Sequence, residues 1–334
     1  MRSCHMALIG ATGVVGREIL QLLEEQEFPL RELTLLASAH SEGSRLTFRG
    51  RTLVVQMLTK ANLAGVDLAI FAAHAEQSRD FVEHAVSAGA IAIDCSQAFR
   101  LDPRTPLCVP EINASVLSQH QGMIATPHSV TLQVALALAP LHEAASLKRV
   151  VISAYQAVSG MGRSAMQAFD QQMRELMNFR QPELDTFPHQ LAFNCVPQCG
   201  DFLDNGYTSD EAALIEETRK LLNAPTLAVT ATSVRVPLMH SHAASVTLET
   251  QHPLSPDAAR DLLQAAPGIL VEDDPSRLSY PSPVRANGQD DVLVGRLRVD
   301  ESVPHGLHLW VVADNLRRGA ALNVIQVATA ILSA

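Results

Sequence analysis

The sequence predicts an α/β protein, with an N-terminal Rossmann-like, doubly wound parallel sheet and a C-terminal α+β domain with a mostly antiparallel sheet. Two observations lead to this prediction. Residues 6–29, MALIGATGVVGREILQLLEEQEFP, have the pattern of an apolar strand, a glycine-rich turn and an amphipathic helix. From about Lys148 the pattern changes to long strands with hairpin-type turns. We therefore expect a Rossmann domain over 1–127, an α+β domain over 128–313, and a closing helix over 314–334 that packs back on the first domain.

The glycine-rich turn carries a variant of the dinucleotide fingerprint, because Gly10, Gly13 and Gly16 are spaced as G-x-x-G-x-x-G. Glycines at such a turn permit a tight bend and bring backbone N–H groups close to a pyrophosphate, which the start of the helix then favours. The position between a strand and a helix supports a nucleotide site. A Rossmann-like domain that binds nothing remains the alternative.

The segments that follow are spaced as in a parallel α/β sheet, with a crossover helix between two of the strands. The expected strands cover 33–38, 66–73, 90–96 and 122–126, and the helix covers 77–89. The second half contains four longer β-rich stretches, 149–160, 227–251, 292–300 and 306–314, before an amphipathic final segment. No low-complexity linker separates the halves, so we expect the two domains to pack closely.

Composition excludes several classes of function. The formal net charge is −10 at pH 7 and the basic residues are scattered, which argues against nucleic-acid binding. The apolar runs are strand-length, so no membrane span is expected. The first residues, MRSCHMALIG, lead directly into a strand and leave no room for a signal peptide. We expect a cytoplasmic protein.

No metal site is predicted. The five cysteines form no paired framework, and Cys195-x-x-x-Cys199 has no second pair at ligand spacing. Cys95 and Cys108 are expected to be packing residues. His240 and His242 alternate onto one face of a strand, but no third ligand is evident.

Quoted in chain order, several motifs identify a resemblance. They are GATGVVG, LLAS, CSQAFRLDPRTPLCVPEIN, YQAVSGMG, FLDNGYTSDE, RVPLMHSH and GLHLWVVADNLRRGAALN. Together they resemble the aspartate-semialdehyde dehydrogenase family over nearly the whole chain. The resemblance implies that 128–313 is a catalytic and dimerisation domain and that the protein is a homodimer built through its sheet. It also implies the family's chemistry, in which a cysteine attacks an aldehyde, a histidine handles the proton, NADP takes the hydride, and phosphate releases an acyl phosphate.

The resemblance places a serine where the family has its nucleophile. The family's turn is of the Asn-Pro-Asn-Cys type with a glutamine four residues later, whereas this chain has Thr126-Pro127-His128-Ser129 and then Gln133. Gln133 is thereby matched to the family's active-site glutamine. A serine hydroxyl is far less acidic than a thiol and needs a strong base, and its ester is a poorer acyl donor than a thioester. An N-cap role is the simpler alternative for Ser129.

The remaining substrate positions are partly kept. Arg235 and His242, seven residues apart, match the family's carboxylate-binding arginine and general acid/base histidine, and Arg100 matches its phosphate arginine. The resemblance puts Ala244 where the family has a glutamate facing the substrate ammonium, and Ala213 where it has a phosphate lysine. A solvated arginine and an interior histidine are the alternatives for Arg100 and His242.

The cofactor side is altered as well. His40 stands where the family has an arginine for the 2′-phosphate, and His74-Ala75 replaces a glycine pair. A neutral imidazole supplies no charge, so binding of NADP or NAD is expected to be weakened or lost, with little preference between them. Asn315 matches a position near the nicotinamide, and helix capping at Asp314-Asn315 is the alternative. The cofactor-binding positions that the resemblance implies are Gly10, Thr12, Gly13, Val14, Val15, Gly16, His40, Ser41, Ser159, Gly160 and Asn315.

These observations predict a catalytically disabled member of the family that keeps a pocket for a small anionic metabolite or a nucleotide and has a binding or regulatory role. One alternative is an active NAD(P)-dependent semialdehyde dehydrogenase of amino-acid biosynthesis. A second is a hydrolase that uses Ser129 and His242, although the turn lacks the G-x-S-x-G elbow and no acidic partner for the histidine is evident.

Overall fold

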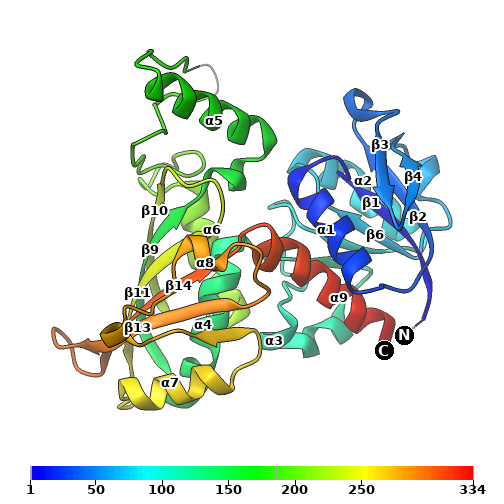
Figure 1. The fold of residues 1–334 in the computed structure, drawn as a ribbon. Coiled ribbons are helices and arrows are strands. Elements are labelled where there is room, and N and C mark those ends of the chain that lie inside the picture. The colour runs from blue at the N-terminus through cyan, green and yellow to red at the C-terminus, as the bar shows by residue number, and fades with distance from the viewer. Residues whose placement is uncertain (1, 185–186, 334) are drawn as a thin grey trace. The chain divides into compact units, whose positions relative to one another are not determined.

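The computed structural model describes residues 2–184 and 187–333. The chain forms two compact units, the first made of Met1–His128 with Ala320–Ala334 and the second of Ser129–Gly319 (Figure 1). The first boundary follows His128, one residue after the predicted position. The return to the first unit follows Gly319 rather than residue 313, so Asp314 and its neighbours belong to the second unit.

The first unit is built on a six-stranded sheet with the order β5-β2-β1-β6-β7-β8, in which every pair is parallel. The strands are β1 (Cys4–Ile9), β2 (Leu30–Ala37), β5 (Gln56–Met57), β6 (Leu68–Phe71), β7 (Ile91–Asp94) and β8 (Met123–Ala125). The chain moves outward from β1 first to one side and then to the other, which makes a topological switch point next to β1. The predicted Rossmann-like parallel sheet is confirmed.

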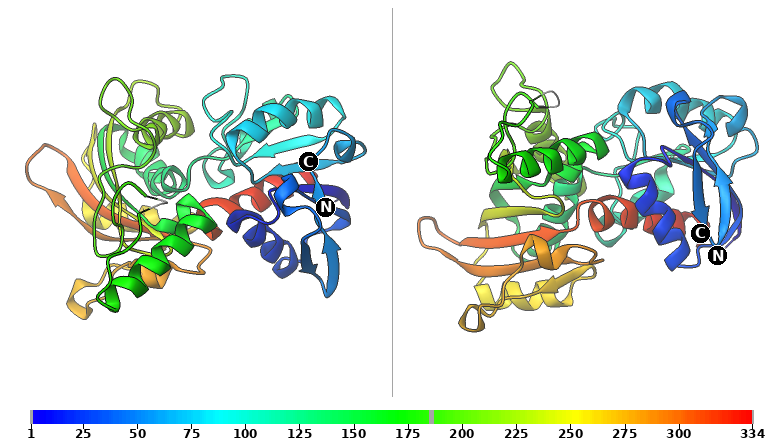
Figure 2. Two further views of the ribbon diagram at one scale, coloured as in Figure 1. Left: turned by 90° about the horizontal axis from the view of Figure 1, so that it is seen from above. Right: turned by 45° about the horizontal axis from the view of Figure 1, so that its top comes forward.

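Helices cover both faces of this sheet. They are α1 (Val14–Glu25), α2 (Ala75–Ser87), α3 (Pro110–Asn113) and α9 (Leu322–Ser333), with 3-10 turns at Ala39–Ser41, Ala61–Leu63 and Ala114–Gln119. Alternate residues of β1 point to opposite faces: Leu8 packs in the core cluster that contains residues of α1 and α9, and Ile9 packs with Val82 of α2. Figures 1 and 2 show α9 (red) beside α1 (blue). A hairpin of β3 (Arg45–Phe48) and β4 (Arg51–Val54) was not predicted.

The second unit contains a mixed six-stranded sheet with the order β10-β9-β11-β14-β13-β12. The strands are β9 (Leu147–Gln156), β10 (Ala228–Arg235), β11 (His242–Thr250), β12 (Ile269–Val271), β13 (Val292–Asp300) and β14 (Gly306–Ala313). The three inner pairs are antiparallel and the two outer pairs are parallel. The predicted antiparallel character thus holds for the centre of the sheet, and the orange turn between β13 and β14 projects from its end (Figure 2).

One face of this sheet is covered by α4, which also packs against α6 and α7 (Figure 1). The helices of the unit are α4 (Ser129–Ala145), α5 (Arg163–Met177), α6 (Ser209–Leu221), α7 (Pro256–Ala265) and α8 (Pro283–Ala286), with 3-10 turns at Val158–Met161 and Pro275–Arg277 and a π-helix at Arg317–Ala321. On the other face, Tyr155 and Trp310 lie with ring centroids 5.5 Å apart. Within the described ranges, no helix has the length and apolar character needed to cross a membrane.

Candidate functional site

Two of the three glycines in the first turn are required by packing. Gly10 has φ +81°, and a Cβ there would lie 2.1 Å from the backbone oxygen of Ala72. A Cβ at Gly16 would lie 2.3 Å from the oxygen of Gly10. These two positions bring β1, α1 and the end of β6 together, and any larger residue would push the backbone apart.

Gly13 differs from its two neighbours in the motif. It is the N-cap of α1 with φ −68° and ψ 170°, which any residue adopts, and no side chain caps the helix there. A Cβ at Gly13 would meet one atom of the chain, the oxygen of Gly10 at 3.2 Å. Packing therefore explains Gly13 poorly, whereas a pyrophosphate that approaches the first N–H groups of α1 would explain it. The turn fits a nucleotide.

The other positions predicted for the nucleotide lie around this turn or on the second unit. Val14 and Val15 begin α1, and the Thr12 hydroxyl donates to Ser41 Oγ at 3.2 Å, which ties the turn to the 3-10 helix after β2. His40 is exposed on that 3-10 helix. His74 is the exposed N-cap residue of α2 and makes no capping hydrogen bond with its side chain.

Ser129 is the first residue of α4. Its hydroxyl makes no hydrogen bond with another residue in the ranges 2–184 and 187–333, so the predicted N-cap role is wrong. The side chain is half-buried, and a Cβ on Gly319 would lie 2.7 Å from Ser129 Cβ. Gly319 thus packs directly against the serine.

Arg235 and His242 are both held by the peptide groups of Ala157, the residue after β9. Arg235 Nη1 donates to the oxygen of Ala157 at 2.8 Å, and the Ala157 N–H donates to His242 Nδ1 at 3.0 Å. Both side chains are buried, with 5% and 0% exposed. A Cβ on Gly160 would lie 3.2 Å from His242 Nε2 and 3.4 Å from Arg235 Nη1. The loop after β9 therefore brings the two predicted site residues together.

The hydrogen bond from Ala157 fixes the state of the His242 ring. A backbone N–H can only donate, so Nδ1 is the acceptor and the neutral ring carries its proton on Nε2. His242 is buried and hydrogen-bonded, as the interior-histidine alternative predicts. The ring still lies against Gly160 and shares Ala157 with Arg235, which is the arrangement of a site.

Sequence analysis missed Gln156. It ends β9, is 2% exposed, and lies opposite Arg235 in the parallel ladder, so the two side chains share a face of the sheet. The signal was present in the motif YQAVSGMG, which places an amide directly before the loop that anchors the site.

Gln133, the predicted active-site glutamine, is 0% exposed within α4, and neither of its amide atoms has a hydrogen-bond partner among the residues that the structure describes. Buried amides left without partners are uncommon.

Asn315 is held by two donors and does not cap a helix. Its Oδ1 accepts from the Ser159 hydroxyl at 3.0 Å and from the Ser241 N–H at 2.9 Å, which leaves the Nδ2 group as a donor on the other side. The capping residue is Asp314, whose Oδ1 accepts from the N–H groups of Leu316 and Arg317 at 2.9 Å each. Of the two residues predicted as capping alternatives, Asp314 therefore caps the helix and Asn315 does not.

Arg100 is buried, with 8% exposed, so the solvated alternative is wrong. Its Nε donates to the oxygen of Thr126 at 3.0 Å and its Nη2 to the oxygen of Cys95 at 2.7 Å. These bonds tie the segments that follow β7 and β8. Nearby, burial raises the pKa of Asp94, which accepts hydrogen bonds from the hydroxyls of Ser78 and Ser96.

The two alanines lie in different surroundings. Ala244 is fully buried on β11, two residues after His242 and on the same face of the sheet. Ala213 is half-buried in α6. Both carboxylate oxygens of Glu211, two residues earlier in the same helix, are bonded to backbone: they accept from the N–H groups of Thr208 and Ser233 at 2.8 Å each.

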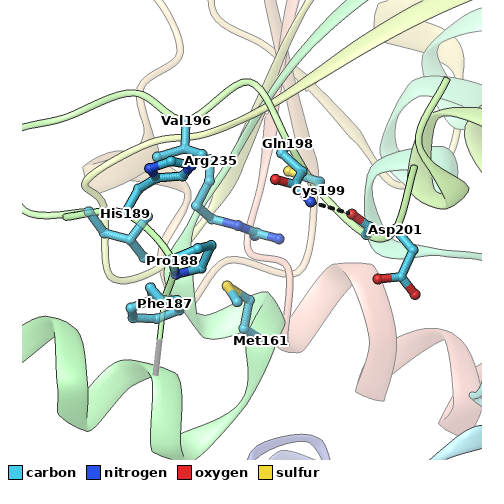
Figure 3. A pocket seen from close by; sticks show the side chains of 11 residues that line it. Met161, Phe187, Pro188, His189, Val196, Gln198, Cys199, Asp201 and Arg235 are labelled. Carbon is cyan, nitrogen blue, oxygen red and sulfur yellow. Dashed lines mark hydrogen bonds between the residues drawn. The ribbon is translucent and has the colours of Figure 1, made fainter. Parts of the chain in front are cut away.

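A cavity of about 240 Å³ opens beside Arg235 (Figure 3). Its residues are Met161, Phe187, Pro188, His189, Leu191, Val196, Gln198, Cys199, Gly200, Asp201 and Arg235. In this view the guanidinium extends into the space between Met161 and Cys199. All of these residues belong to the second unit.

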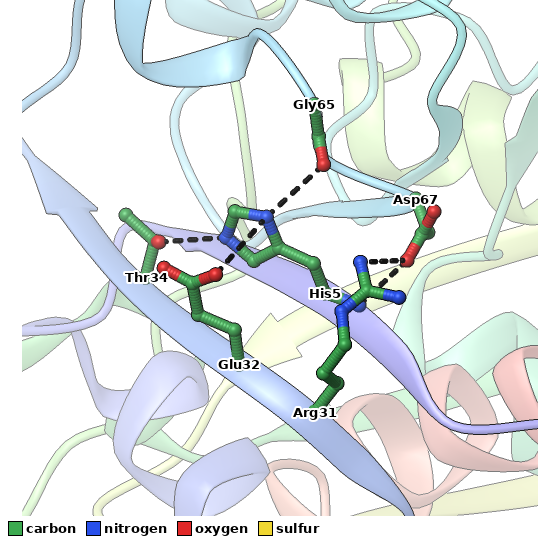
Figure 4. Close-up of polar contacts among 6 residues, drawn as sticks. All are labelled: His5, Arg31, Glu32, Thr34, Gly65 and Asp67. Carbon is green, nitrogen blue, oxygen red and sulfur yellow. Dashed lines mark hydrogen bonds and ion pairs between the residues drawn. The ribbon is translucent and has the colours of Figure 1, made fainter.

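A second polar cluster, at the opposite end of β1 from Gly10, has a structural explanation (Figure 4). His5 Nδ1 lies 3.1 Å from the oxygen of Gly65 and Nε2 lies 2.9 Å from Thr34 Oγ1. Asp67 accepts from the His5 N–H at 2.7 Å and from Arg31 at 3.1 Å, and the backbone bond is the larger cause of its lowered pKa. Every polar group of this cluster binds a neighbour, so it fastens β1 to β2 and to the loop before β6.

The cysteines differ sharply in surroundings, which leads to a prediction. Burial raises the pKa of Cys4 and Cys199 to about 11 and of Cys95 and Cys108 to about 12, whereas Cys195 is exposed. Because the thiolate is the reactive form, we expect a disulfide reagent at pH 8 to label one thiol in the native protein and all five in denaturant. Cys195→Ala should abolish the native signal. Rapid labelling of that variant would contradict the assignment.

No group of three His, Cys, Asp or Glu side chains suited to a metal occurs in the described part of the chain.

Comparison with known proteins gives a consistent result. Residues 5–120 match the family described as semialdehyde dehydrogenase, NAD binding domain, and residues 138–318 match semialdehyde dehydrogenase, dimerisation domain. The chain is 43% identical over 328 residues to the aspartate-semialdehyde dehydrogenase of Aquifex aeolicus, covering 97% of this chain and 96% of that one. It is 42% identical over 335 residues to the enzyme of Bacillus subtilis, covering 98% and 97%. The crystal structure of aspartate semialdehyde dehydrogenase II from Vibrio cholerae superposes with a TM-score of 0.96 at 40% identity, covering 99% of each chain. The chain belongs to the aspartate-semialdehyde dehydrogenase family.

Proposed function

We propose that this chain is a catalytically disabled member of its family that keeps a binding site for a small carboxylate and, weakly, for a nicotinamide nucleotide. The role is one of binding or regulation. The observation that carries the proposal is the state of Ser129 and His242. The serine hydroxyl has no hydrogen bond to a base in the described part of the chain, and the neutral His242 ring already carries a proton on Nε2.

The state of the Ser129 hydroxyl and the tautomer of His242 together disfavour nucleophilic attack by the serine. A cysteine needs no partner to be partly ionised at neutral pH, whereas a serine must lose its proton to a base as it attacks. A ring held with its proton on Nε2 cannot accept another there without giving up the Ala157 hydrogen bond. The resemblance adds Ala213 and Ala244 at positions where the family has charged contacts.

The proposed binding of a carboxylate and a nucleotide is supported by a buried charge without a counter-ion among the described residues and by space beside the first turn. Arg235 is buried and pairs with no carboxylate of the described residues, and its Nε has no hydrogen-bond partner there. A buried charge without a counter-ion is costly. Gln156 on the same face adds an amide, and Gly13 leaves room for a pyrophosphate. His40 supplies no fixed charge for a 2′-phosphate, so NAD and NADP should bind with similar affinity.

The test of lost catalysis is a steady-state assay with the semialdehyde, phosphate and NADP. We expect no turnover above the background of a Ser129→Ala control. A catalytic constant within tenfold of the ordinary enzyme value, about 10 s⁻¹, would establish the active-dehydrogenase alternative instead.

The hydrolase alternative is disfavoured by the same histidine. In a catalytic triad the Nδ1–H group donates to a carboxylate, but here Nδ1 accepts from a backbone N–H. We expect no labelling of Ser129 by a fluorophosphonate. Labelling that disappears in Ser129→Ala would revive the hydrolase.

We also propose a homodimer, supported by the match of 138–318 to a dimerisation domain. Light scattering at micromolar protein should give the mass of two chains. The mass of one chain would contradict this proposal and leave the others untouched.

A further inference from the structure

The cavity beside Arg235 has an apolar floor with a single charge. Phe187, Leu191 and Cys199 are 4%, 4% and 1% exposed, and Arg235 is 5% exposed. Burial raises the pKa of Cys199 to about 11, so its thiol is neutral at pH 7 and adds to the apolar surface. Such a floor recognises a molecule with one anionic group and one apolar group.

The rim of the cavity is polar and exposed. It carries Pro188, His189, Gly200 and Asp201, all exposed, and Gln198, whose amide nitrogen is 3.3 Å from the oxygen of Gly200. Figure 3 shows the Asp201 carboxylate at the edge, turned away from the guanidinium of Arg235. The floor is therefore reached from solvent through a polar mouth.

Among the residues that the structure describes, no buried carboxylate lines the cavity to pair with a ligand ammonium. Of the described residues that line the cavity, Asp201 alone is acidic, and it is exposed on the rim. Asp210 and Glu211 are close enough to influence the Cys199 thiol, but neither lines the cavity, and both oxygens of Glu211 already accept backbone N–H groups. A ligand with an ammonium group would leave that charge unpaired against an apolar wall, which is unfavourable.

The size of the cavity sets the size of the ligand. An apolar cavity of about 150 Å³ accommodates benzene. The volume here is about 240 Å³, which leaves room for a ring or a branched aliphatic group together with a carboxylate.

We infer that the site takes a monocarboxylate with a compact apolar substituent and no ammonium group, its carboxylate on Arg235 and its apolar part on Phe187, Leu191 and Cys199. The inference rests on the proposed binding role of Arg235 and adds the chemical class of the ligand. A cavity with this selectivity would bind a different class of ligand from a pocket that selects an amino acid derivative carrying an ammonium group.

Calorimetric titration of the full-length protein at pH 7 tests this with four probes: phenylacetate, phenylacetamide, acetate and L-aspartate. Phenylacetamide keeps the ring without the charge, and acetate keeps the charge without the ring. We expect phenylacetate to bind about tenfold or more tightly than each of the other three, since each lacks one of the two contacts or adds an unpaired charge. Equal affinity for phenylacetate and acetate, or tighter binding of L-aspartate, would overturn the inference.

Two variants locate the binding. Arg235→Gln should remove the preference for phenylacetate over phenylacetamide, and Arg149→Gln, at an exposed arginine of β9, should leave it intact. Leu191→Ala should weaken phenylacetate several-fold and leave acetate unchanged, with Cys199→Ser as a second wall variant if Leu191→Ala does not fold. Unchanged phenylacetate binding in folded Arg235→Gln would place the ligand elsewhere and overturn the inference. Tighter binding of L-aspartate would overturn the inferred ligand class but would still agree with the proposed carboxylate site. The loss of catalysis is tested separately, by the turnover assay.

Discussion

Gly10→Ala is expected to unfold the first unit or to prevent its folding. The added methyl would lie 2.1 Å from the oxygen of Ala72, a backbone atom that cannot move without displacing β6, and the residue has φ +81°. The strained dihedral and the clash together should lower the free energy of unfolding by about 3 kcal/mol or more. Thermal unfolding followed by circular dichroism measures this change.

Gly13→Ala is the matched control for the same turn. Its methyl meets one oxygen at 3.2 Å at an ordinary φ, so its stability should stay within about 1 kcal/mol of the parent protein. The methyl would stand where a pyrophosphate approaches, so the weak affinity for NAD and NADP should fall about tenfold or more in calorimetric titration. A Gly13→Ala protein as unstable as Gly10→Ala, or one with undiminished nucleotide affinity, would show that Gly13 serves packing alone.

Ser129→Cys is expected to restore little activity. The thiol would be a few per cent ionised at neutral pH and so would supply a nucleophile, but Ala213 and Ala244 would still lack the charged contacts that the family resemblance implies. We expect a catalytic constant about 10³-fold or more below the ordinary value of about 10 s⁻¹. Steady-state kinetics beside Ser129→Ala measure the gain. Recovery to within tenfold of an ordinary enzyme by this one change would mean that the rest of the site is intact.

The sequence was sufficient where a pattern reports local geometry. The turn was predicted from the spacing of Gly10, Gly13 and Gly16 between a strand and a helix, and the structure shows close contacts that demand glycine at the first and third of these positions. The strands predicted at 33–38, 66–73, 90–96 and 122–126 correspond to β2, β6, β7 and β8, and the helix at 77–89 corresponds to α2, with ends that differ by a few residues. The family resemblance likewise singled out Arg235 and His242, which the structure shows bonded to the same residue, Ala157.

The sequence was insufficient where a contact joins distant segments. Gln156 and Arg235 are neighbours only because β9 and β10 pair in parallel, and parallel register cannot be read from one strand. The orientation of Asn315 depends on Ser159 and Ser241, which lie far away in the chain. Capping was predicted for the pair Asp314-Asn315, and the sequence could not decide between the two because either residue type suits that position.

The central claim, a family member that binds ligands without performing the family's chemistry, is tested most directly by mixing the protein with the semialdehyde and NADP in the absence of phosphate. With a working nucleophile, hydride transfer would form one NADPH per active chain in a rapid burst and stop at the acyl-enzyme. The account predicts no burst and less than about 0.01 NADPH per chain over an hour, since no described residue is hydrogen-bonded to Ser129 as a base and His242 accepts at Nδ1. A burst close to one NADPH per chain would contradict the account and identify the protein as an active dehydrogenase.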